Sequence, residues 1–262
     1  MIAKVRIALA ILALLTVTAI LLPVHLVLLW LKHPWRNRLP RYWHRAALWA
    51  LGVRATVHSS LAHHRPLLIV ANHSSWLDIL VLASIVDVTY VAKAEVRDWP
   101  VFGILARLQR SIFVVREQKR KTQHQANEIA ERMNAGEIVV LFPEGTTSDG
   151  NRLFATKSSL FGAATSAVAD SPDGCVYVQP LAIGYTKIHG MPMGHYHRPV
   201  AAWPGDVELL PHLMGVLETG ALDAEVNFGP AIAVTADTNR KFLAQTAEDE
   251  IRRLLEEILH RR

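Results

Sequence analysis

Residues 67–78 read Leu67-Leu68-Ile69-Val70-Ala71-Asn72-His73-Ser74-Ser75-Trp76-Leu77-Asp78, and the fold that we expect follows from their pattern. Its first part is a run of small or branched apolar residues, which predicts a short buried strand. Asn72, His73 and Ser74 then form a turn, and Ser75 opens a helix with Asp78 as its capping-box partner. The turn places an imidazole, hydroxyls and a carboxylate at the C-terminal end of a strand, where open α/β sheets bind ligands.

The spacing between His73 and Asp78 limits how their side chains can meet. Five residues of regular helix rotate by about 500°, so two residues at this spacing would not share a helix face. They meet only if His73 lies in the turn and Asp78 in the first turn of the helix, which is where the pattern puts them. Asp78 would then hold one ring nitrogen and leave the other free to accept a proton. The alternative is that Ser75 and Asp78 only cap a helix and that His73 is a loop residue.

A second stretch, residues 137–146, is another buried strand, and it ends in a Pro-Glu-Gly-Thr turn. Together, Asn-His-Ser-Ser-Trp-Leu-Asp at 72–78 and Phe-Pro-Glu-Gly-Thr at 142–146 resemble the lysophospholipid acyltransferase family of the 1-acylglycerol-3-phosphate type. The resemblance implies an α/β fold with a mixed central sheet flanked by helices. It also implies that His73 and Asp78 are the catalytic pair and that the turn binds the acceptor through Glu144, Gly145 and Thr146.

Two further stretches resemble the family's pocket segments. Lys93 begins a Lys-x-Glu-x4-Pro-x2-Gly stretch that lines the pocket in the family; a solvated charged loop is the alternative. Residues 110–116 match the block Gly-x-Ile-Phe-Ile-Asp-Arg in part, because Arg110 and Val115 replace its Gly and Asp. Arg116 is retained, and the resemblance implies that it binds the head group of the acceptor, as a guanidinium suits phosphate or carboxylate. The alternative is a surface arginine at a strand end.

The residues after Glu144 bear on the acceptor. Thr147 stands where the family more often has an arginine that would help to neutralise a phosphate. Either Arg152 supplies this charge from further along, or the acceptor carries no phosphate. The run Glu-Gly-Thr-Thr-Ser-Asp-Gly-Asn-Arg at 144–152 resembles the branch that acylates lyso-ornithine lipid, an amino-acid lipid. Lys157 lies near the family's position for a basic contact.

The N-terminal residues predict a membrane anchor. Residues 7–31 contain no charged residue, and as a helix they reach roughly 37 Å, against about 30 Å for the hydrocarbon core of a bilayer. Pro23 and His25 interrupt the second half, so a kinked span and a re-entrant helix both fit. More Lys and Arg follow the run than precede it, which places its C-terminal side in the cytoplasm. A buried helix of a soluble domain is the alternative.

We therefore expect an anchor over 1–38 and a cytoplasmic acyltransferase domain over 39–262, at the cytoplasmic face of the inner (plasma) membrane. Residues 39–51 are predicted to form an interfacial amphipathic helix. The formal charge of +5 favours an anionic membrane surface as a partner. We expect no nucleic-acid partner, since the chain has no Gly/Arg-rich tract or zinc-finger spacing. We also expect no metal, because His195-x-His197 has no third ligand at suitable spacing.

The predicted reaction is the transfer of an acyl group from a thioester, acyl-ACP or acyl-CoA as co-substrate, to the hydroxyl of a lysolipid, with no cofactor. His73 would deprotonate the hydroxyl and Asp78 would stabilise the imidazolium. A serine hydrolase using Ser74 or Ser75 is one alternative, although the chain has no Gly-x-Ser-x-Gly elbow. A second is a nucleotide-binding protein, but residues 145–152 lack the Lys and Ser/Thr of a P-loop. A catalytically silent lipid-binding protein is the third.

Overall fold

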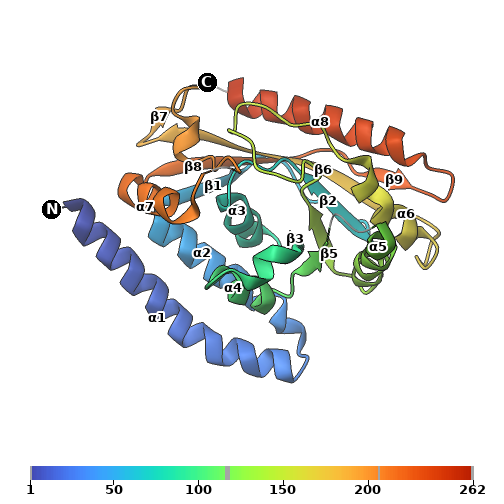
Figure 1. Ribbon diagram of the computed structural model, residues 1–262, viewed down its shortest axis with the longest axis horizontal. Coiled ribbons are helices and arrows are strands. Elements are labelled where there is room, and N and C mark those ends of the chain that lie inside the picture. Colours follow the sequence, from blue (N-terminus) through green and yellow to red (C-terminus); the bar gives the residue numbers. More distant parts are fainter. Residues whose placement is uncertain (1, 116–118, 206, 261–262) are drawn as a thin grey trace.

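A mixed β-sheet forms the centre of the molecule, with helices on both faces (Figure 1). The computed structural model describes residues 2–115, 119–205 and 207–260. The strands are β1 Val53–Val57, β2 Leu67–Ala71, β3 Val88–Lys93, β4 Ile112–Val114, β5 Ile138–Leu141, β6 Val176–Ile188, β7 Met191–Pro192, β8 Leu222–Phe228 and β9 Ile232–Val234. The helices are α1 Ile2–Trp30, α2 Leu39–Leu51, α3 Leu77–Ile85, α4 Phe102–Leu108, α5 Lys119–Asn134, α6 Gly162–Val168, α7 Leu209–Thr219 and α8 Arg240–His260, with 3-10 turns η1 Pro34–Arg36, η2 Ala94–Asp98, η3 Ser158–Phe161 and η4 Arg198–Val200.

The order of the strands across the sheet is β1-β8-β6-β2-β5-β3-β4. Strand β2 runs parallel to both of its neighbours, β5 and β6, and β3 runs parallel to β5 and β4. Strand β6 is antiparallel to β7, β8 and β9. The predicted mixed sheet flanked by helices is therefore confirmed, and the ends of the parallel strands β2 and β5 lie side by side.

Strand β2 is buried on both faces, which explains its unbroken apolar sequence. Successive strand residues point to opposite faces of a sheet. Leu67, Ile69 and Ala71 accordingly pack into a core with residues of α2, α3 and α7, while Leu68 and Val70 pack into a second core with residues of α5, α6 and α8. All five side chains have no exposed surface. The strand that carries the His73 turn is thus held rigidly between two cores.

The structure differs from the sequence-based expectation at the start of α3, and it contains a C-terminal strand that was not predicted. Helix α3 begins at Leu77, two residues after Ser75. Strand β9 follows β8 after Gly229 and Pro230, and it pairs with β6. Strand β6 is long enough to pair with β9 through residues 176–178 and with β8 through residues 181–188. The short strand β9 is stabilised by its hydrogen bonds to β6 rather than by a strong strand pattern in its own sequence.

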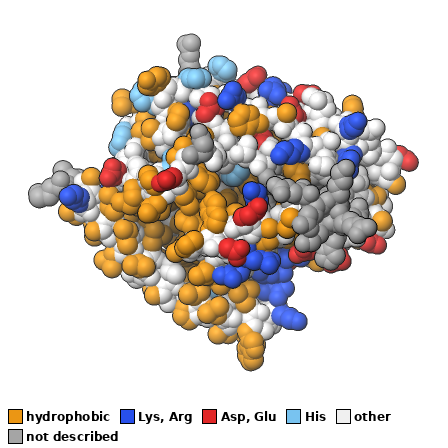
Figure 2. All heavy atoms as spheres, viewed as in Figure 1, with side chains coloured by type: hydrophobic (Ala, Val, Ile, Leu, Met, Phe, Trp, Pro, Cys, Tyr) orange, Lys and Arg blue, Asp and Glu red, His pale blue; other side chains and the backbone are white. Residues whose placement is uncertain are grey.

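Helix α1 lies against the domain and keeps one apolar face outward. Its Arg6 donates to the carbonyls of Leu217 and Thr219 at the end of α7, the latter at 3.0 Å. Near the other end, the ring of His25 bonds the Leu108 carbonyl at the end of α4 at 2.9 Å. Hydrophobic side chains gather at the lower left of Figure 2, over α1. The helix is long and apolar enough to cross a membrane, and the division into 1–38 and 39–262 stays a prediction.

We expect Ile69→Ala to lower the free energy of unfolding by about 2–5 kcal/mol, because it leaves a cavity in a core that cannot collapse around it. Val57→Ala, on the edge strand β1 at 40% exposure, should cost less than about 1 kcal/mol. Denaturant unfolding of both variants in detergent would measure the difference. Equal losses of unfolding free energy in the two variants would mean that β2 is not the rigid centre of the sheet.

Candidate active site

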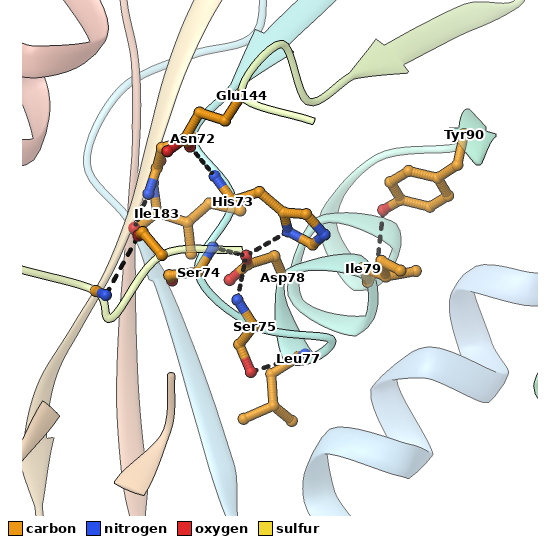
Figure 3. Close-up of polar contacts among 12 residues, drawn as sticks. Asn72, His73, Ser74, Ser75, Leu77, Asp78, Ile79, Tyr90, Glu144 and Ile183 are labelled. Atoms are coloured by element: carbon orange, nitrogen blue, oxygen red, sulfur yellow. Dashed lines mark hydrogen bonds and ion pairs between the residues drawn. The ribbon is translucent and has the colours of Figure 1, made fainter. Parts of the chain in front are cut away.

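The turn after β2 brings His73 and Asp78 into contact, as the spacing required (Figure 3). His73 Nδ1 lies 2.9 Å from Asp78 Oδ2, and the Asp78 side chain is fully buried. The same oxygen accepts from the backbone N–H groups of Ser74 and Ser75, at 2.7 and 2.8 Å. The second oxygen accepts from the hydroxyl of Tyr185 on β6 at 2.7 Å. Asp78 also lies in the first turn of α3, where the helix dipole favours a negative charge.

These contacts determine which nitrogen of His73 is available. A carboxylate only accepts hydrogen bonds, so Nδ1 carries the proton and Nε2 of the neutral ring is free to accept one. The ring stacks on Phe142 at the end of β5, with centroids 4.0 Å apart and planes 16° from parallel. The side chain is 18% exposed. His73 is therefore a base held on two sides, with its remaining nitrogen accessible.

Glu144 braces the same turn from the neighbouring strand. Its Oε1 accepts from the backbone N–H of His73 and its Oε2 from the backbone N–H of Phe154, both at 2.7 Å. The residue is 3% exposed. Burial raises the pKa of Glu144 to about 7, although the two backbone hydrogen bonds act in the opposite direction and nearby Asp78 adds to the rise. Both oxygens of Glu144 are thus occupied by backbone N–H groups, and the side chain links the turn that holds His73 to the segment at Phe154.

The other side of the turn is tied to β6. The Asn72 side chain donates to the carbonyl of Ile183 at 2.9 Å and accepts from the backbone N–H of Ile183 at 2.8 Å (Figure 3). The Trp203 backbone N–H donates to the carbonyl of Ser74, and that of Ser148 donates to the carbonyl of His73. Three separate segments thus hold the His73 turn in one conformation.

His73 opens onto an apolar cavity of about 400 Å³. The cavity is walled by side chains from α1, α2, α3, α4 and α7, among them Leu14, Ala47, Leu80, Leu105 and Leu213. Among the described residues, no Asp, Glu, Lys or Arg lines it. His44 also borders the cavity, and burial lowers its pKa to about 4, so this imidazole is neutral. The cavity suits an uncharged, flexible hydrocarbon chain.

The remaining predicted substrate-binding residues are more exposed. Gly145 takes a left-handed conformation with φ of 76°, and the following Thr146 is exposed. Arg152 and Lys157 are exposed as well, and the Arg152 guanidinium stacks on the ring of Phe154 at 5.2 Å. Lys93 pairs with Glu95 at 3.4 Å, outside the apolar cavity. Arg116 lies outside the described residues. Their roles in binding the acceptor stay predictions.

Sequence reasoning missed Tyr185 and Phe142 as parts of the site. Tyr185 lies 107 residues from Asp78 in the chain and occurs in an ordinary buried strand. Phe142 belongs to the recognised turn, but its stacking on His73 depends on β2 and β5 being neighbours. In the part of the chain that the structure describes, no group of three His, Cys, Asp or Glu side chains could hold a metal ion.

This chain is similar to known proteins in sequence and in fold. Residues 53–184 match the family model described as Acyltransferase. The whole chain is 58% identical to the lyso-ornithine lipid O-acyltransferase of Rhizobium meliloti (strain 1021), covering 90% of that protein. It is 50% identical to the lyso-ornithine lipid O-acyltransferase of Brucella abortus (strain 2308), over 99% of this chain and 97% of that one. The fold matches the crystal structure of PlsC, the 1-acyl-sn-glycerophosphate (LPA) acyltransferase of Thermotoga maritima, with a TM-score of 0.66 and 20% identity over 99% of each chain.

Tyr185→Phe should lower kcat about tenfold, because Asp78 loses a hydrogen bond worth about 1.5–3 kcal/mol and then orients the ring of His73 less firmly. The less stabilised carboxylate also attracts the protonated imidazole more strongly, so the acid side of the kcat profile should move to higher pH. Tyr177→Phe, the same change on the same strand, should alter neither quantity. A Tyr185→Phe enzyme that loses stability but keeps its pH profile would show that the hydroxyl only supports packing.

The raised pKa of Glu144 predicts a pH dependence of stability. Between about pH 4.5 and 7 the folded state holds a proton that the unfolded state releases, so stability falls as pH rises through this range. The unfolding free energy of the wild type minus that of Glu144→Gln should therefore decrease, by at most about 1.4 kcal/mol per pH unit. Unfolding curves at several pH values would measure it, with exposed Glu256→Gln as the control. A difference that stays constant from pH 4.5 to 7 would contradict the prediction.

Proposed function

Because this chain belongs to the Acyltransferase family and is an acyltransferase, we propose that it moves a fatty acyl group from a thioester to the hydroxyl of a lysolipid at the membrane surface. The contact between His73 and Asp78 beside the apolar cavity carries this proposal. The site thus places a base next to a cavity that can hold an acyl chain.

The chemistry needs one well-placed base. A thioester is an activated acyl donor, whereas an alcohol is a poor nucleophile until its proton is removed. His73 Nε2 takes this proton as the hydroxyl oxygen attacks the thioester carbonyl, and the ring is then a cation beside the Asp78 carboxylate. When the tetrahedral intermediate collapses, the carbon–sulfur bond breaks and the proton passes to the thiolate that leaves. No covalent enzyme intermediate is required.

The serines of the turn suit this scheme better than a serine hydrolase. Ser74 is 1% exposed and its hydroxyl makes no hydrogen bond within the described residues. The Ser75 hydroxyl accepts from the backbone N–H of Leu77 at 3.3 Å. A nucleophilic serine has to lie within hydrogen-bond reach of its base. Since His73 makes its described side-chain hydrogen bond to Asp78 alone, its free nitrogen is left for the substrate.

For the acceptor we propose lyso-ornithine lipid in preference to lysophosphatidate. The two most similar relatives named above carry the former activity in their names, and they align over nearly the whole chain. In agreement, Thr147 is buried and uncharged where the family more often has an arginine. A site without that guanidinium is less suited to a phosphate and accepts a head group that brings both an amine and a carboxylate.

The anchor would place the cavity at the level of the lipid acyl chains. Helix α1 contributes Leu14 to the cavity and exposes Leu12, Leu15 and Ile20 on its outer side. Since Arg6 and His25 tie both halves of α1 to the domain, we propose that the helix lies within one leaflet rather than crossing the bilayer. A one-chained lipid then enters the cavity sideways, and the donor, acyl-ACP or acyl-CoA, arrives from the cytoplasm.

A competition assay tests this function. With labelled acyl-ACP or acyl-CoA, purified full-length enzyme should acylate lyso-ornithine lipid at least tenfold faster, by kcat/KM, than lysophosphatidate. His73→Ala should lower the rate by about 10²- to 10⁴-fold, the usual contribution of a general base, while still floating with vesicles and unfolding like the wild type. A serine-reactive fluorophosphonate should not label the enzyme.

Three results would count against the proposal. Turnover retained in His73→Ala would remove the base from the mechanism. A preference for lysophosphatidate would keep the reaction and change the acceptor. Hydrolysis of the donor with neither acceptor acylated would point to a thioesterase instead.

A further inference from the structure

A second, polar pocket lies at the edge of the sheet opposite to His73. It has a volume of about 390 Å³ and includes Val88 and Ile138, the first residues of β3 and β5. His73, in contrast, follows the last residue of β2, which runs parallel to β5. The polar pocket shares Gln109 with the apolar cavity and has its own lining otherwise. It is therefore a separate site, which acyl transfer at His73 does not use.

The two carboxylates of the polar pocket are already neutralised. Asp87 pairs with Arg41 at 2.9 Å. Glu137 pairs with Arg110 at 2.9 Å and accepts from Nε of Arg132 at 2.7 Å. Arginines beyond those needed for these pairs therefore leave the pocket with excess positive charge.

Three further guanidinium groups line the polar pocket, and one of them, that of Arg38, also interacts electrostatically with Asp87. Arg36 and Arg38 come from the segment between α1 and α2, and Arg65 from the loop before β2. Within the described residues none of the three forms a salt bridge, although each borders the same cavity. Figure 2 shows Lys and Arg side chains gathered over the segment that joins α1 to α2. Several guanidinium groups around one pocket suit phosphate, because the planar fork of an arginine matches two phosphate oxygens.

The polar pocket is also held in shape before any ligand arrives. Arg110 donates to the Asn37 side chain at 2.6 Å while it pairs with Glu137, so it fastens the segment after α1 to the turn before β5. Arg65 donates to the carbonyls of Ala62 and His64, at 2.9 and 2.6 Å. A preorganised site of this kind loses little entropy on binding.

The position of the polar pocket indicates where its anion comes from. Trp30, at the end of α1, is 81% exposed, Leu31 is 57% exposed and Trp35 is 47% exposed. Exposed tryptophans beside a long apolar helix are typical of the membrane–water interface. Arg36 and Arg38 follow these residues in the chain, so a bilayer whose interface lies at the tryptophans would bring lipid phosphates to these two arginines. A phospholipid held there can lay its chains along the exposed apolar face of α1, which a soluble phosphate cannot do.

We propose that the pocket formed by Arg36, Arg38 and Arg65 binds the phosphate of an anionic membrane phospholipid, one molecule for each enzyme and distinct from the substrate. The bound lipid seats the end of α1 at the membrane surface and adds a specific contact to the general attraction of a basic protein for an anionic leaflet. This inference rests on the membrane association in the proposed function, but not on the acceptor or on the role of His73.

Native mass spectrometry of the full-length protein in detergent, with phosphatidylglycerol or phosphatidylcholine added, tests the proposal. The wild type should retain one phosphatidylglycerol and no phosphatidylcholine. The double variant Arg36→Gln/Arg38→Gln should retain phosphatidylglycerol at least fivefold more weakly. The control Arg54→Gln/Lys241→Gln removes the same charge from exposed positions elsewhere and should retain it like the wild type. Arg65→Gln, a milder change, should weaken retention in the same direction if the double variant fails to fold.

Two outcomes would overturn the proposal. Equal losses in the double variant and its control would mean that only diffuse charge attracts the lipid. Displacement of phosphatidylglycerol by coenzyme A or by inorganic phosphate at similar concentrations would assign the pocket to a soluble phosphate. In detergent, the rate of acyl transfer by Arg36→Gln/Arg38→Gln should stay within twofold of the wild-type rate. His73→Ala should bind phosphatidylglycerol as the wild type does. These two results distinguish a failure of this inference from a failure of the proposed function.

Discussion

The buried carboxylate of Asp78 is the group on which the rest of the site depends. It receives four hydrogen bonds, from the His73 ring, from two backbone N–H groups of the same turn and from Tyr185. A buried charge is tolerated only when its hydrogen-bonding capacity is filled. The turn therefore has to close around Asp78, and this closure fixes the orientation of the imidazole. The contacts that stabilise the buried charge of Asp78 therefore also orient His73 so that its Nε2 is free to accept a proton.

Around this charge the protein arranges surroundings of opposite character. On the side of β5 and β6 the turn is braced by polar contacts through Glu144 and Asn72. On the other side it faces an apolar cavity in which His44 is neutral. A proton-accepting nitrogen at the boundary between a rigid polar network and a hydrocarbon-like space is suited to a reaction between a hydroxyl and an acyl thioester. The N-terminal helix is part of this arrangement, since Leu14 lines the cavity.

Much of the fold and part of the site could be predicted from local patterns. The apolar run at 67–71 predicted a short buried strand, and the structure shows that both faces of β2 lie in cores. The five-residue offset from His73 to Asp78 predicted their contact, because the turn and first helical turn are local geometry. Strand β9 escaped prediction, as its three residues form a strand only beside β6. The contacts of Glu144 could not be predicted from the sequence either, because the backbone groups that it binds come from different segments, at His73 and Phe154.

The order of residues along the chain is enough to specify the chemical groups that are available: a histidine and an aspartate at a spacing that lets them meet, a second turn with a glutamate, and an apolar N-terminal helix. These follow from neighbours along the chain, whose geometry depends on short-range backbone rules. Three other features could be seen only in the folded molecule: Tyr185 completes the hydrogen bonds of Asp78, α1 forms one wall of the cavity, and Arg36, Arg38 and Arg65 border one pocket. Those contacts join residues far apart in the chain, and they exist because a sheet and its covering helices bring distant segments to the same place.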